Sequence, residues 1–142
     1  MESLVRMTAI SPQAALIYVM VTVSAADGNM DVSEIDAIAA RVRDLPAFAN
    51  FERAHLLRTA QECGAILAET DGLDAVLGLV TEALSEPLKE TAYLLALDVA
   101  LSDHQVRLEE IRILDRLCQA LGLDHLITAA LERAARARLQ TA

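Results

Sequence analysis

An acidic turn at residues 27–34, DGNMDVSE, holds the side chains best suited to chemistry. Asp27, Asp31 and Glu34 supply three carboxylates there, and Asn29 adds an amide oxygen. Oxygen ligands of this kind are the ones that Ca²⁺ and Mg²⁺ prefer in proteins. We therefore predict a first divalent-cation site at Asp27, Asp31 and Glu34.

The same turn also has a purely structural interpretation. Asp31 and Glu34 have the spacing of a capping box, in which two side chains satisfy backbone amides at the start of a helix. Gly28 suits the left-handed residue that follows a helix end. Asp27 fits less well, because a carboxylate at a helix C-terminus meets the negative end of the helix dipole. Cation binding and simple capping both stay open, and Asp27 distinguishes them.

An EF-hand is excluded by two positions of the turn. Asp27, Asn29 and Asp31 match the first, third and fifth loop positions of an EF-hand. Val32, however, replaces the glycine of the sharp turn, and Ile38 replaces the terminal glutamate. A cation at this turn would need a different arrangement of ligands.

A second acidic turn is found when the sequence is aligned with itself at a shift of 76 positions. The shift places Asp27 on Asp103 and Glu34 on Glu110. Asp103 and Glu110 therefore form a second candidate metal site. Arg107 stands where the first turn has Asp31, and its guanidinium could neutralise the carboxylates without a metal. If only one turn binds a cation, we expect the first.

An all-α fold must position these turns. The chain has 142 residues, which fits one domain spanning 1–142, and it is 54% hydrophobic but only 3% aromatic, with few Gly or Pro. Seven helices are expected in a compact bundle, with helix 1, turn and helix 2 repeated as helix 5, turn and helix 6. The first and second are expected at 12–26 and 32–43, and the third runs from a cap at Asn50 to residue 67. The fourth follows a turn at 70–72 and ends at 84, and the fifth runs from a cap at Ser85 to 101. The sixth follows a turn at 103–105 and ends at Gly122, and the seventh begins after a cap at Asp124.

Apolar residues at helical spacing predict which side chains face the core. One stripe belongs to the helix at 32–43 and another to the helix that ends before Gly122. The first comprises Ile35, Ile38, Ala39 and Val42, and the second Leu108, Ile111, Leu114, Leu117 and Cys118.

A charge-free stretch at 7–26 approaches the length of a membrane span and also has some features of a signal peptide. Residues 11–13, SPQ, interrupt the stretch, and its likeness to the internal helix at 86–101 favours a helix of the protein core. We therefore expect no transmembrane segment. Cys63 and Cys118 are best explained as buried thiols in a reducing compartment, so a cytoplasmic location is expected.

Several function classes are disfavoured by charge and by missing motifs. The net charge of −9 repels phosphate backbones, so a nucleic-acid binder is not expected. No nucleophile motif, Gly-rich phosphate loop or His-rich metal set is present, so an enzyme is not expected. Glu109 and Glu110 are adjacent on a helix and point about 100° apart, which is poor geometry for shared acid and base catalysis.

The chain resembles the TerB-like family. The resemblance rests on residues 25–28 (AADG), Asp31 and 33–35 (SEI), repeated as 94–103 (LLALDVALSD) and 109–111 (EEI). That family includes the tellurite-resistance protein TerB and the N-terminal region of DjlA-type co-chaperones. The resemblance implies a helical fold, an acidic site for divalent cations, and a role in stress response or protein association at the inner face of the membrane. The second motif departs from the family pattern at His104 and Arg107.

Together these features predict a non-enzymatic, cation-binding interaction module of the TerB-like kind, linked to stress or tellurite resistance. Its cofactor would be Ca²⁺ or Mg²⁺, and its partner another protein or a second copy of the chain. The alternative is a structural, homodimeric helical domain in which the acids only cap helices and no metal binds.

Overall fold

The computed structural model describes residues 9–27, 32–102 and 106–142. Within those ranges the chain forms α-helices and two short 3₁₀ helices without any strand, which confirms the all-α prediction. The helices are α2 (Pro12–Ser24), η1 (Ala25–Asp27), α3 (Val32–Val42), η2 (Pro46–Phe48), α4 (Arg53–Leu67), α5 (Gly72–Ala83), α6 (Glu86–Ala100), α7 (Leu108–Leu121) and α8 (His125–Arg138).

Side-chain caps fix several of the helix ends where the sequence predicts them. The Ser11 hydroxyl accepts a 3.0 Å hydrogen bond from the Ala14 amide at the start of α2. An Asp124 carboxylate oxygen accepts one of 2.7 Å from the Leu126 amide at the start of α8. These bonds satisfy amides that have no partner within the helix. Gly122, at φ +65°, ends α7 in the left-handed conformation that glycine adopts without strain.

The cap predicted at Asn50 is wrong. Asn50 has a left-handed φ of 66°, and α4 begins only at Arg53, after Glu52. Asparagine is enriched both at helix caps and in left-handed turns, because its short polar side chain tolerates both. Here Asn50 takes the second role and turns the chain towards α4.

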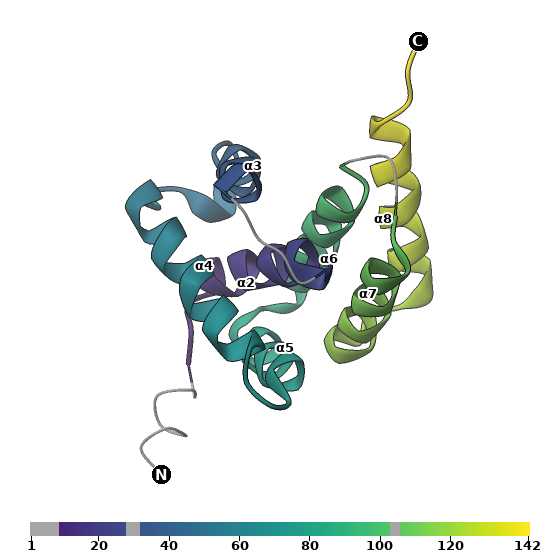
Figure 1. The fold of residues 1–142 in the computed structure, drawn as a ribbon. Helices are drawn as coiled ribbons and strands as arrows, with labels where there is room; N and C mark the ends of the chain where they lie inside the picture. Colours follow the sequence, from purple (N-terminus) through teal and green to yellow (C-terminus); the bar gives the residue numbers. More distant parts are fainter. Residues whose placement is uncertain (1–8, 28–31, 103–105) are drawn as a thin grey trace.

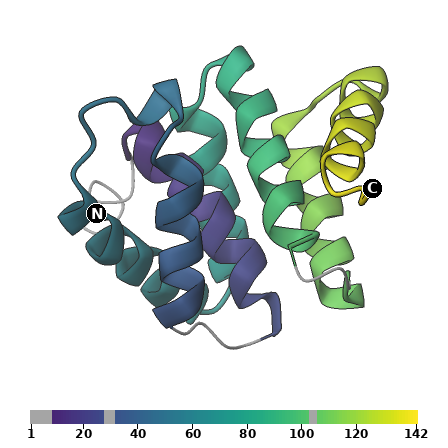
Figure 2. The ribbon, with the colours of Figure 1, turned by 90° about the horizontal axis from the view of Figure 1, so that it is seen from above.

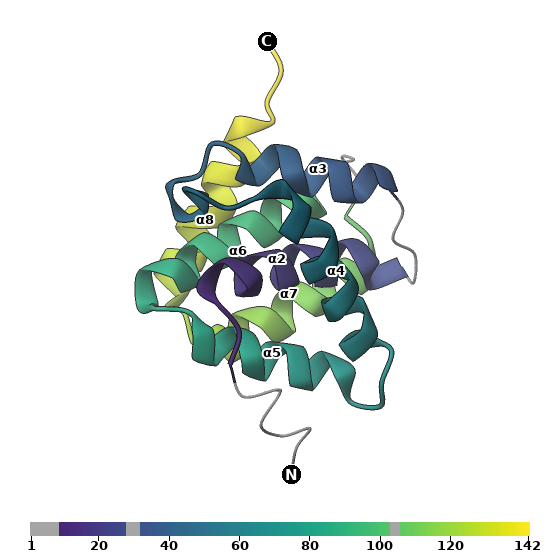
Figure 3. The ribbon, with the colours of Figure 1, turned by 90° about the vertical axis from the view of Figure 1, so that its left-hand side faces the viewer.

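Helix α2 is the centre of the core (Figures 1 and 3). Every side chain from Ala15 to Val23 is buried, on all faces of the helix. Helices α4, α5, α6 and α7 pack around it. A helix that is apolar all round must be enclosed by protein or lipid, and here protein encloses it. The body of α2 from Ala15 to Val23 is therefore core. No helix in the described ranges is long and apolar enough to cross a membrane.

Helices α3 and α8 lie at the periphery (Figure 2). Helix α3 contacts α4 and α2, and Ile38 and Val42 of its predicted stripe are buried. The stripe of α7 follows the prediction only in its second half, where Leu117 is 2% exposed. The prediction is wrong for Leu108 and Ile111, which are 57% and 44% exposed. The first turns of α7 lie at the edge of the bundle, beyond the reach of the core.

Candidate functional site

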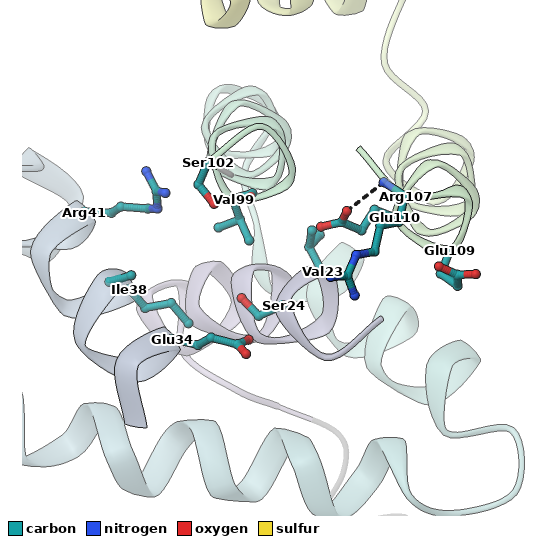
Figure 4. Close-up of a pocket in the computed structure, with 11 residues that line it drawn as sticks. Val23, Ser24, Glu34, Ile38, Arg41, Val99, Ser102, Arg107, Glu109 and Glu110 are labelled. Atoms are coloured by element: carbon teal, nitrogen blue, oxygen red, sulfur yellow. Dashed lines mark hydrogen bonds between the residues drawn. The ribbon is translucent and has the colours of Figure 1, made fainter. Parts of the chain in front are cut away.

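A pocket of about 260 Å³ lies where four helices meet. The last turns of α2 and α6 form part of its wall, and α3 and the first turn of α7 complete it (Figure 4). Its lining residues are Val23, Ser24, Glu34, Ala37, Ile38, Arg41, Val99, Ser102, Arg107, Glu109 and Glu110. Both predicted acidic turns connect helices of this wall, so the pocket gathers the neighbourhoods of both turns.

Glu34 and Glu110 line this one pocket, although the sequence assigns them to separate sites. Glu34 belongs to the first turn of α3, and Figure 4 shows its carboxylate beside Ser24 at the end of α2. Glu110 belongs to the first turn of α7, on another wall. Glu34 and Glu110 therefore line the same pocket, although they belong to different turns.

Glu110 also acts as a helix cap. Its Oε1 accepts a 2.9 Å hydrogen bond from the backbone amide of Arg107, the residue before α7 (Figure 4). This is the reach-back half of a capping box. A carboxylate has about four lone-pair positions, so one capping bond does not preclude a second partner. Capping and ligand binding are therefore compatible at Glu110.

Two arginines bring positive charge to the same pocket. The Arg107 side chain extends from the start of α7 towards the end of α2 in Figure 4. Neutralisation of the second turn's carboxylates by the Arg107 guanidinium stays a prediction. Arg41 was missed by the sequence analysis. It lies seven residues after Glu34 on α3, a spacing that places both residues on one helix face and could have revealed it.

The structure describes the other predicted ligands only in part or not at all. Asp27 closes η1, which packs against α7, but its side chain lies outside the described residues. Asp31 and Asp103 also lie outside them. Among the residues that are described, no group of three carboxylate, histidine or cysteine side chains is arranged to hold a metal ion. Glu34 and Glu110 alone do not make a coordination shell, so a metal would also require Asp27, Asp31 or Asp103.

The sequence matches one family model, described as tellurite resistance protein TerB, over residues 13–134. The chain belongs to the TerB family. The match runs from the first turn of α2 into α8, so it includes every residue that lines the pocket. Searches among curated proteins and among solved structures gave no match.

The two thiols of this TerB-family chain are poorly suited to reducing an oxyanion. Cys63 is fully buried in α4, and burial raises its pKa to about 12 although Thr22 lies within hydrogen-bond distance. Burial also raises the pKa of Cys118, and the carboxylates of Glu132 and Asp115 add to the effect. The thiolate is the reactive form of cysteine, and both environments suppress it. The family description therefore does not translate into thiol chemistry at these residues.

Proposed function

We propose that this TerB-family protein is a non-enzymatic module that binds one divalent cation and changes its protein interactions in response. The cation lies between the two acidic turns, with Glu34 and Glu110 contributing from opposite walls and with Asp27 and Asp31 completing the ligand set. The observation that supports this is that Glu34 and Glu110 line the same pocket. Any effect on tellurite resistance or stress is then indirect, through a partner.

Charge favours a cation at this place. Glu34, Glu109 and Glu110 bring three carboxylates to one pocket, in a chain whose net charge is −9. Carboxylates that line one pocket lower its electrostatic potential, and a divalent cation is stabilised by hard oxygen ligands in such a place. Arg41 and Arg107 offset part of the negative charge. This offset favours one bound ion over two.

An apolar surface beside the pocket could couple cation binding to the binding of a partner protein. Leu108 and Ile111 lie on consecutive turns of α7 and are more than two-fifths exposed. Leu108 follows Arg107 directly, and Ile111 follows Glu110. A cation that pulls on Glu110 would therefore shift the first turn of α7 and this apolar surface with it. We propose that a protein partner, or a second copy, binds there in the cytoplasm or at the inner face of the membrane.

Calorimetry and thermal melting test the cation. The chain is stripped with a chelator and titrated with Ca²⁺, Mg²⁺ and Mn²⁺, and its melting temperature is recorded with and without each ion. A ligand at about 100 times its Kd stabilises the folded state by about 2.7 kcal/mol, so a binding ion raises the melting temperature measurably. Absence of both heat and shift at millimolar concentration of all three ions would remove the cation from the proposal.

The second candidate is a structural homodimer without metal, and exposed Leu108 and Ile111 favour it. Large exposed apolar side chains on one helix face are typical of interfaces between copies. Light scattering over a concentration series distinguishes the two candidates. A dimer that forms equally with chelator and with divalent ions supports the structural candidate, whereas association that appears only with the ion supports the module.

A further inference from the structure

A second pocket, of about 270 Å³, lies on another side of α3, between α3, η2 and α4. Figure 1 shows the segment that joins α3 to α4 at the upper left of the view. The pocket shares no lining residue with the acidic one. Its lining residues are Asp36, Ala39, Ala40, Val42, Arg43, Phe48, Phe51, Arg53 and Leu56.

The floor of this second pocket is apolar and well held. Val42, Phe48 and Leu56 are each no more than 6% exposed and belong to the hydrophobic core. The rings of Phe48 and Phe51 meet edge to face, with centroids 5.4 Å apart. Such an arrangement is favourable for aromatic pairs and fixes both rings. The floor is thus preformed for an apolar group.

The rim of the pocket is basic, in a protein that is strongly acidic overall. Arg43 follows the end of α3, and Arg53 is the first residue of α4. The Arg53 guanidinium donates a 3.1 Å hydrogen bond to Asp36, but both side chains are more than three-fifths exposed. Exposed ion pairs contribute little free energy, so another carboxylate can replace Asp36 at modest cost. The positive end of the α4 dipole adds to the potential at this rim.

We propose that this pocket binds a small aliphatic monocarboxylate. The aliphatic tail lies on Val42, Phe48 and Leu56, and the carboxylate lies between Arg43 and Arg53, in competition with Asp36. Guanidinium groups suit carboxylates because their N–H donors match the carboxylate oxygens. The volume is just below the range of drug-sized pockets, which favours a short or medium chain.

Other ligand classes match the pocket less well. A nucleotide or sugar phosphate would cover an apolar, aromatic floor with polar groups and lose their hydration. An alkyl amine would bring a positive charge to two arginines. The chain of a neutral alcohol would pack on the apolar floor, but its hydroxyl would form no ion pair with the arginines of the rim. Among these ligand classes, an apolar group that carries a carboxylate matches both the apolar floor and the basic rim.

A chain-length series tests the tail. Butanoate, hexanoate, octanoate and decanoate are titrated into the wild-type chain, with calorimetry and amide chemical shifts as readouts and a chelator present so that the acidic pocket plays no part. Affinity is expected to rise about fourfold for each added methylene and to level off when the pocket is full. Octan-1-ol and octylamine are expected to bind more weakly than octanoate.

Charge variants test the head group in two directions. Arg43→Gln and Arg53→Gln are expected to weaken octanoate binding by about two- to fivefold each, whereas Asp36→Asn is expected to strengthen it because the competing carboxylate is gone. Arg58→Gln, an exposed arginine of α4 that does not line the pocket, is the matched control and should leave the affinity unchanged.

A blocking variant tests the location. Ala40 is an exposed lining residue of α3, and Ala40→Leu should fill the pocket without disturbing the core, abolish octanoate binding and leave the melting temperature nearly unchanged. The proposal is overturned if octanoate shows no saturable binding at millimolar concentration, if octan-1-ol binds as tightly, if Arg58→Gln weakens binding as much as Arg43→Gln, or if Ala40→Leu binds normally. These results are independent of the cation, so the two proposals fail separately.

Discussion

Glu34, in the first turn of α3, and Glu110, in the first turn of α7, line one pocket although 76 positions separate them in the sequence. The relationship arises because α3 and α7 begin beside the last turns of α2 and α6, which pack against each other in the core. Two glutamates that the sequence assigns to separate turns thereby line the same pocket. The predictions below test what that location binds and what stabilises the fold around it.

Asp27→Asn distinguishes cation binding from capping. Asp27 closes η1 at the end of α2. A carboxylate at a helix C-terminus is disfavoured by the helix dipole. With a cation ligand at Asp27, the variant loses most of the rise in melting temperature that divalent ions produce. Without ions it should be equal to wild type or more stable by up to about 1 kcal/mol. An undiminished response of the variant to ions would exclude Asp27 from the site.

Arg107→Gln tests the role of the internal cation. The substitution removes a positive charge from the pocket and leaves the backbone amide that Glu110 caps. We expect the affinity for Ca²⁺ or Mg²⁺ to rise by about two- to fivefold, as expected for one exposed charge interaction. Arg112→Gln, at an exposed residue of α7 that does not line the pocket, is the control in the same titration. Equal effects of the two variants would mean that only overall charge matters.

Asp124→Ala tests the cap of α8. The Asp124 carboxylate accepts a 2.7 Å hydrogen bond from the Leu126 amide. Loss of such a cap costs about 1 kcal/mol, so urea unfolding should show a reduced free energy of unfolding. Asp124→Ser retains a capping oxygen and should unfold nearly like wild type. If the serine variant lost as much stability as the alanine variant, the charge of Asp124 would matter and the cap would not.

The raised pKa of Cys63 predicts that the free energy of unfolding falls at alkaline pH. Burial raises its pKa from 9.0 to about 12, so between those values the folded state holds a proton that the unfolded state releases. This contribution is complete below about pH 9 and is lost as the pH rises towards 12. Burial also raises the pKa of Tyr18 to about 12, which acts in the same direction above its ordinary 10.0.

Urea unfolding at about pH 8 and about pH 10.5 measures this dependence. The free energy of unfolding should be lower at the higher pH. Cys63→Ala should start from lower stability, because it leaves a small cavity, but should lose less between the two pH values. Identical losses in the variant and in wild type would assign the dependence to other groups.

Helix ends and the central helix follow directly from local sequence. Ser11, Ser85, Asp124 and Gly122 act at short range, and the charge-free body of α2 requires burial on every side. The exposure of Leu108 and Ile111 was not predictable, because periodicity shows which residues share a face and does not show how far the core extends under it. The cap prediction at Asn50 was wrong because asparagine is common both at helix caps and in left-handed turns.

The candidate site was predictable residue by residue but not as a unit. The acids Glu34 and Glu110 stand out by type and spacing, whereas their common pocket depends on how α3 and α7 pack beside α2 and α6. Arg41 also enters the pocket through that packing. Long-range packing of this kind leaves no mark on local sequence patterns, so the sequence did not predict that Glu34 and Glu110 line the same pocket.

The most direct test is a calorimetric titration of the ion-free chain beside Glu34→Gln, Glu110→Gln and the exposed control Glu90→Gln. Glutamine keeps a side-chain oxygen that can accept the hydrogen bond from the Arg107 backbone amide. Glu110→Gln therefore removes the charge without removing the cap. We predict one ion per wild-type chain, a loss of at least tenfold in affinity in each pocket variant, about 1.4 kcal/mol, and no change in the control. Two ions per chain, each lost in only one of the pocket variants, or no binding at all, would contradict a shared cation site.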